Sequence, residues 1–241
     1  MTKIHVLPGD AQVEEFGKTG IEGEVVVCRE ALIDGDVRAE SLEEFWRVRE
    51  EFLGNTYPES EVTYRELVVS EFEKLLHLKS DVDVNLWFEY ELFCQVNMWF
   101  CVWLLRDTKA TLFRVAPILQ RKDHAWDGFG GMSAEGLNVC YTERLKFSKN
   151  DIQLGSELWI AYRNRDYDKL RELSIIESAC FPYLKEACDA EIEKDITPKQ
   201  VLMNLRRDGV NDFGDIFTAF REQAGVYGYG DSQVKRMLTE I

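Results

Sequence analysis

The chain has 241 residues, of which 45% are apolar and 12% aromatic, and its formal net charge is −15. This length and apolar content are enough for a hydrophobic core, which excludes an intrinsically disordered chain. The acidic balance makes nonspecific binding to nucleic acids or to anionic membranes unfavourable, because like charges repel. The charge also has a simpler explanation, since it keeps a protein soluble.

Cysteine usage and the N-terminus indicate a cytoplasmic protein. The six cysteines are scattered without a Cys-x-x-Cys pair, which is typical of reduced cytosolic chains and argues against disulfides or a zinc site. Residues 1–10 contain no apolar signal-peptide core. The apolar run Leu92–Leu105 is too short to span a bilayer and includes Gln95 and Asn97. We therefore expect no membrane association.

The first half of the chain alternates between strand and helix patterns. Short apolar runs bounded by turn residues predict strands at Lys3–Leu7, Gly23–Cys28, Val84–Phe88 and Thr111–Val115. Apolar residues at helical spacing predict helices at Ala11–Lys18, Leu42–Leu53, Thr63–Leu78 and Leu92–Leu105. The last helix is apolar on all sides, which predicts complete burial. This alternation predicts an α/β fold with a mainly parallel, Rossmann-like sheet and flanking helices.

The second half shows helix patterns alone. A glycine-rich aromatic loop at Asp123–Met132 predicts a boundary between an α/β domain (residues 1–127) and an all-α C-terminal domain (residues 128–241). Helices are predicted at Ser133–Arg144, Lys149–Arg163, Asp166–Leu173, Tyr183–Glu193, Thr197–Arg207, Asp212–Gln223 and Ser232–Glu240. The last three could form a helix-turn-helix-like unit. Its basic and acidic residues balance, so a packing or protein-binding bundle is favoured over a DNA-binding unit.

Several ordered segments carry a family resemblance that spans nearly the whole chain. They are Gly9-Asp10, GEVVVCREALIDGDV (Gly23–Val37), WFEYELFCQVNMWF (Trp87–Phe100), GFGG (Gly128–Gly131), LWIAYRNRDYDKLREL (Leu158–Leu173), FPYLKEA (Phe181–Ala187), VNDFGDIF (Val210–Phe217) and VYGYGD (Val226–Asp231). With these segments the chain resembles the bacterial domain-of-unknown-function family numbered 1835, in the form associated with Bacteroidetes. The resemblance implies no activity and no catalytic residue.

Two segments depart from that family's pattern. Glu91-Leu92-Phe93 replaces a common Asp-Leu-Phe, which keeps the carboxylate. Residues 194–198 replace a common Arg-Phe-Pro segment, which puts the packing of the C-terminal helices in question.

Polar residues follow the predicted strands, where parallel α/β sheets bind ligands. The candidate site residues are Asp10, Arg29, Glu30, Glu89, Glu91, Gln95 and His124. Their carboxylates could bind a divalent cation through oxygen ligands. Alternatively, the site could hold a small polar ligand, with Arg29 binding a carboxylate or phosphate.

Other interpretations of these residues remain open. Arg29 could form a structural ion pair with Glu30, Asp34 or Glu91, and Cys94 is expected to be buried and inert. The chain has neither a dinucleotide-binding nor a P-loop glycine pattern. The sequence therefore favours a binding module at the strand ends. A regulatory or protein-interaction role of the C-terminal helices and a metal- or phosphate-handling enzyme are the alternatives.

Overall fold

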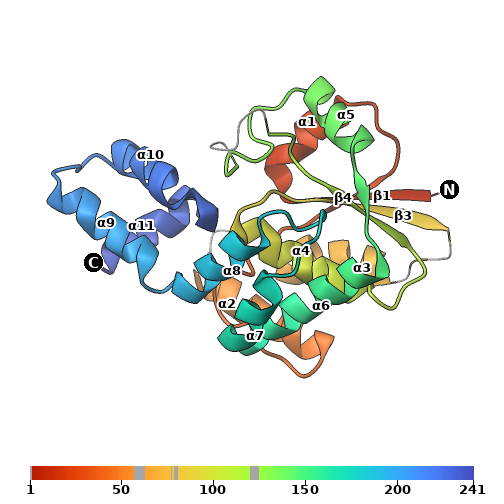
Figure 1. Ribbon diagram of the computed structural model, residues 1–241, viewed down its shortest axis with the longest axis horizontal. Helices are drawn as coiled ribbons and strands as arrows, with labels where there is room; N and C mark the ends of the chain where they lie inside the picture. The colour runs from red at the N-terminus through yellow and green to blue at the C-terminus, as the bar shows by residue number, and fades with distance from the viewer. Residues whose placement is uncertain (1, 57–62, 77, 79–80, 120–124) are drawn as a thin grey trace.

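The computed structural model describes residues 2–56, 63–76, 78, 81–119 and 125–241 (Figure 1). Its centre is a five-stranded sheet with the order β2-β1-β3-β4-β5. The strands are β1 (Thr2–Leu7), β2 (Glu24–Val27), β3 (Val82–Trp87), β4 (Thr111–Val115) and β5 (Leu145–Lys146). The first four strands are parallel, and β5 pairs antiparallel with β4. These observations confirm the α/β class and the mainly parallel sheet.

The strand order changes direction at β1. From β1 the chain moves to β2 on one side of it and then to β3 on the other. In open parallel sheets such a reversal leaves a crevice outside the carboxyl ends of the two central strands, here β1 and β3. In this fold, the residues that follow Leu7 and Trp87 are therefore the ones expected to line a ligand site.

Helices cover both faces of the sheet. A single 3-10 turn at Asp10–Gln12 leads into α1 (Val13–Gly17), which lies with α5 (Ala134–Thr142) on one face (Figure 1). The other face carries α4 (Leu92–Leu105) and α6 (Lys149–Asn164), which pack against each other. Because both faces are covered, the central strands are buried on both sides, and they carry two buried polar residues, His5 in β1 and Asn85 in β3.

Helix α4 is the most buried helix of the fold. Eleven of its fourteen residues are buried, including Trp99 and Phe100. Two further helices follow β2: α2 (Leu42–Thr56) and α3 (Ser70–Leu76), the latter preceded by a π-helical turn at Arg65–Val69. Within the described part of the chain, no helix is both long enough and apolar enough to cross a membrane.

The C-terminal helices form a lobe beside the sheet. After α7 (Tyr167–Ser174) and α8 (Leu184–Glu193), the chain forms α9 (Thr197–Arg207), α10 (Phe213–Ala224) and α11 (Asp231–Thr239), which Figure 1 shows at the left. Asp34 ties α11 to the N-terminal half. Its carboxylate lies 2.9 Å from the Arg236 guanidinium and accepts a hydrogen bond from the Gln233 amide.

The structure corrects one prediction about the second half of the chain. Strand β5 lies within residues 128–241, so the expectation of an all-α second half is wrong there. One cluster of buried residues extends from Ile4 to Met237 and includes residues on both sides of position 127.

Candidate functional site

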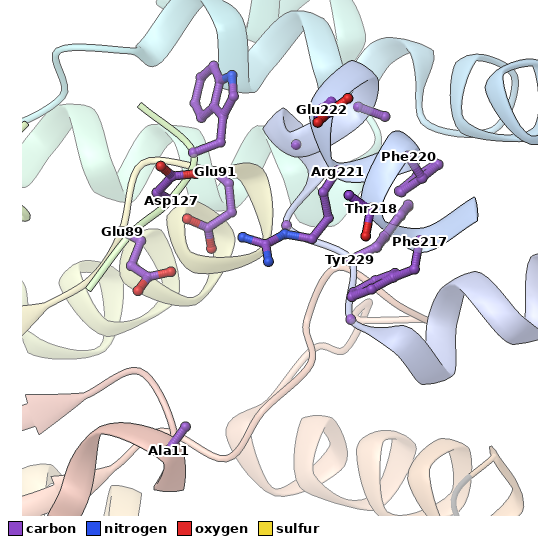
Figure 2. Close-up of a pocket in the computed structure, with 15 residues that line it drawn as sticks. Ala11, Glu89, Glu91, Asp127, Phe217, Thr218, Phe220, Arg221, Glu222 and Tyr229 are labelled. Carbon is purple, nitrogen blue, oxygen red and sulfur yellow. The ribbon is translucent and has the colours of Figure 1, made fainter. Parts of the chain in front are cut away.

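A cavity of about 930 Å³ lies between the carboxyl edge of the sheet and the C-terminal lobe (Figure 2). A second cavity of about 610 Å³ adjoins it, and the two share Ala11, Glu89, Glu91 and Gly228 in their linings. Together we call them the cleft. The residues after β1 and β3 form one wall of the cleft, and α10 with the loop at residues 225–230 forms the other.

Glu91 is the most buried acidic residue of the cleft. It is the N-cap of α4, and its Oε1 accepts a hydrogen bond from the Cys94 amide at 3.1 Å. Its Oε2 is buried and has no hydrogen-bond partner among the described residues. Burial raises the pKa of Glu91 from 4.5 to about 8, and the negative charge of Glu89 adds to this shift. One oxygen of Glu91 thus caps helix α4, while the other makes no hydrogen bond to any residue that the structure describes.

Glu89 lies beside Glu91 and is held from two directions. Its Oε1 accepts a hydrogen bond of 2.6 Å from the Phe129 amide, and its backbone carbonyl accepts one from the Gln95 side chain. Burial raises the pKa of Glu89, although the Phe129 amide and the charges of Arg114 and Arg221 oppose the shift. Two carboxylates are therefore fixed side by side in a largely dehydrated place.

Two left-handed glycines cover these carboxylates. Gly128 has φ +66° and Gly228 has φ +68°. A Cβ on Gly128 would lie 2.1 Å from the carboxyl carbon of Glu89, and one on Gly228 would lie 2.2 Å from Cγ of Glu91. Only glycine allows such close approach in this backbone conformation. The GFGG and VYGYGD segments therefore form the cover over the glutamate pair.

Arg221 faces the glutamate pair across the cleft. Its side chain extends from α10 toward Glu91, as Figure 2 shows, with Phe217 and Tyr229 near its base. Within the part of the chain that the structure describes, no hydrogen bond or ion pair joins Arg221 to another residue. Its charge is nevertheless close enough to lower the pKa of Glu89. The Arg221 guanidinium thus faces the glutamate pair with a space between them.

Two further polar groups line the second cavity. Gln12 is only 8% exposed, and neither its amide oxygen nor its amide nitrogen has a hydrogen-bond partner among the described residues. Cys94 is buried in the first turn of α4, and burial raises the pKa of its thiol. Its Sγ and one oxygen each of Glu89 and Glu91 all lie within 4.8 Å of one another. The cleft therefore contains polar atoms of Gln12 and Glu91 that no described residue satisfies, and one close group of possible metal ligands.

The predicted site residues divide into two groups. Glu89 and Glu91 line the cleft, and the Gln95 side chain supports Glu89 from behind. Asp10 and Arg29 do not belong to the linings of either cavity. They form an ion pair with each other at 2.8 Å, and Arg29 also donates a hydrogen bond to the Leu67 carbonyl.

Glu30 and His124 are the other two predicted residues. Glu30 lies in the core, where it forms an ion pair with Arg49 at 2.9 Å and accepts a hydrogen bond from the Tyr64 hydroxyl. Neither Arg49 nor Glu30 exposes its side chain. The pair is structural, and the structure does not bring Glu30 to the glutamates of the cleft. His124 lies outside the described residues.

The structure adds cleft residues that the sequence did not single out. They are Gln12, Asp127 and Arg221, together with Cys94, which was expected to be inert. Arg221 belongs to an ordinary amphipathic helix, and its position in the sequence gives no sign of a site. A scan against models of protein families, a search of curated proteins and a search of solved structures each found no match to this chain.

Proposed function

We propose that this protein binds a small dipolar ligand in the cleft, with a positive group beside Glu89 and Glu91 and a negative group beside Arg221. One observation carries the proposal. The buried Oε2 of Glu91 and the guanidinium of Arg221 have no partner among the described residues, yet they face each other across the cavity. A molecule that carries both charges completes both groups at once.

The electrostatics of the cleft favour this class of ligand. Glu89 and Glu91 raise each other's cost of ionisation, and a cationic group between them relieves their repulsion. The Arg221 guanidinium presents a planar fork of donors that matches a carboxylate or phosphate. A ligand with only one charge would leave the opposite wall of the cleft unsatisfied.

The size and walls of the cleft also fit a small molecule. Its larger part has a volume of about 930 Å³, at the upper end of the range usual for small-ligand sites. Trp126, Phe217 and Tyr229 provide apolar walls around the charged groups. The position at the carboxyl ends of β1 and β3 supports a Rossmann-like arrangement of the ligand site.

Two broader expectations remain proposals beside this one. All six cysteines are free and buried, which supports a reducing, cytoplasmic location. The glycine segments GFGG and VYGYGD that carry the resemblance to the domain-of-unknown-function family numbered 1835 are the ones that cover the cleft glutamates. Two of the segments that carry the resemblance therefore lie at the proposed site.

Thermal unfolding with matched small molecules tests the proposal. The protein is treated with a chelator and heated with a series of straight-chain amino acids whose amine and carboxylate are separated by one to five methylene groups. The matching alkylamines and alkylcarboxylates serve as singly charged controls. We expect at least one dipolar member to raise the midpoint of unfolding, because only dipolar molecules neutralise both walls.

Variants connect that effect to the cleft. Arg221→Met and the double variant Glu89→Gln/Glu91→Gln are expected to abolish the stabilisation. Arg207→Met is the matched control, because Arg207 is an exposed arginine of α9 remote from the cavity lining. Equal stabilisation by singly charged molecules, or no stabilisation by any dipolar member, would refute a dipolar ligand.

A further inference from the structure

We infer that Glu89, Glu91 and Cys94 hold a divalent transition-metal cation of the zinc type at the floor of the cleft. This inference rests on the proposed function: in the metal-loaded protein the cation occupies the place beside the two glutamates that the positive group of a dipolar ligand occupies in the metal-free protein. The three side chains come from the end of β3 and the first turn of α4. The negative group of the bound small molecule would be the fourth ligand of the metal.

The start of α4 places the three donors together. Glu91 is the N-cap and Cys94 the third residue of the first turn, so their side chains project at the same end of the helix. One donor atom from each of Glu89, Glu91 and Cys94 lies within 4.8 Å of the other two. Tetrahedral zinc separates its ligand atoms by about 3.3 to 3.8 Å, given bond lengths of about 2.0 to 2.3 Å. Small rotations of the glutamate side chains close this difference.

Two separate observations show that polar side chains at the proposed metal site lack hydrogen-bond partners in the described part of the chain. Glu91 keeps its helix cap through Oε1 and leaves Oε2 buried and unused. Gln12 lines the same cavity, is 8% exposed, and leaves both amide atoms without a partner among the described residues. A buried polar atom without a partner costs about 1 to 3 kcal/mol. A cation with its bound water gives both residues the partner that the protein itself does not supply.

The donor set selects the kind of metal. Magnesium and calcium prefer oxygen ligands alone, whereas a thiolate favours zinc and similar transition metals. Three protein ligands leave the fourth position of a tetrahedral cation open, which is the arrangement of zinc sites that bind a further ligand. That position opens toward Arg221, where the negative group of a ligand is expected.

Cobalt is a suitable probe because it replaces zinc in tetrahedral sites and absorbs light when a thiolate binds it. The full chain, freed of metal by a chelator, is titrated with Co²⁺. We expect a thiolate-to-cobalt charge-transfer band in the near ultraviolet that saturates at one equivalent. Competition with Zn²⁺ should remove the band, and an excess of Mg²⁺ should not.

Cys94→Ser is expected to lose the charge-transfer band, and Glu89→Gln is expected to weaken Co²⁺ binding at least tenfold while keeping the band. Glu89→Gln also guards against misfolding, since Glu89 is less buried than Cys94. Cys188→Ser is the matched control, because Cys188 is a buried cysteine of α8 outside the cleft. Circular dichroism shows whether each variant is folded.

The absence of a saturable band in the folded protein would overturn the inference. Cys28 and Cys101 are buried cysteines whose thiols interact with each other. A band that survives in Cys94→Ser but disappears in Cys28→Ser or Cys101→Ser would overturn the inference too, because the metal would then lie at that pair. Either failure is distinct from failure of the proposed function. Binding of dipolar molecules to the chelator-treated protein is measured without any metal.

Discussion

Replacing Glu91 by glutamine should change how the stability of the protein depends on pH. Glutamine keeps an oxygen for the Cys94 amide, so the helix cap survives while the ionisable group is lost. In the folded protein the pKa of Glu91 is raised from 4.5 to about 8, mainly by burial. The folded state therefore binds more protons than the unfolded state between these two values, and the free energy of unfolding must fall as pH rises through this window.

The size of the effect follows from the shift in pKa. One unit corresponds to about 1.4 kcal/mol, so the shift of Glu91 sets an upper limit of about 5 kcal/mol. Water that enters the cleft when Glu91 ionises reduces this cost, and we expect about 1 to 3 kcal/mol. Glu91→Gln should gain this amount over the native protein near pH 8 and little near pH 4.5.

Urea unfolding followed by tryptophan fluorescence measures the difference across the pH range, in the presence of a chelator. Glu51→Gln is the control, because Glu51 is an exposed glutamate of α2 outside the cleft. If Glu91→Gln and the native protein keep parallel profiles between pH 4.5 and 8, Glu91 is not a buried carboxyl with a raised pKa, and the description of the cleft floor is wrong.

Three further predictions concern neighbouring parts of the structure, and urea unfolding measures the change in stability for each. Gln12→Leu removes two buried polar atoms that lack a hydrogen-bond partner among the described residues, so it should raise the free energy of unfolding by about 1 kcal/mol. The same substitution should weaken Co²⁺ binding. A loss of stability would mean that Gln12 is a structural residue. Gly228→Ala should lower the free energy of unfolding by more than about 2 kcal/mol, because its Cβ would overlap Glu91. Gly131 also has a positive φ but faces open space, so Gly131→Ala should lower it by about 1 kcal/mol. Equal losses would contradict the close approach at Gly228. Arg49→Met should lower the free energy of unfolding by about 3 to 5 kcal/mol, because it leaves the Glu30 charge buried without a partner cation. Adding Glu30→Gln should restore part of that loss. No recovery would show that the two charges are not coupled.

Much of the α/β half could be predicted from the sequence because its signals are local. Val84 and Leu86 belong to a short apolar run bounded by polar residues, and such a run predicts a buried strand wherever it occurs. The apolar residues around α4 likewise predicted burial on all sides, as the structure confirms. Glu89 and Glu91 could be selected because carboxylates next to such residues need an explanation.

The rest depends on contacts between distant parts of the chain. Strand β5 has only two residues, Leu145 and Lys146, and exists because β4 offers an edge for pairing. Glu30 follows its strand as Glu89 does, yet it turns into the core because Arg49 reaches it from α2. Arg221 comes to the cleft only when the C-terminal lobe packs beside the sheet, which no local pattern specifies.

The most direct test of a ligand site between the glutamate pair and Arg221 is capture of a natural ligand. The purified protein is mixed with a protein-free cell extract, separated by gel filtration, and denatured, and the released small molecules are identified by mass spectrometry. We predict an enriched compound with both a positive centre, either an amine or a bound metal, and a carboxylate or phosphate. It should be absent from Arg221→Met and from Glu89→Gln/Glu91→Gln. No enriched compound, or equal enrichment by these variants, would contradict the proposed site.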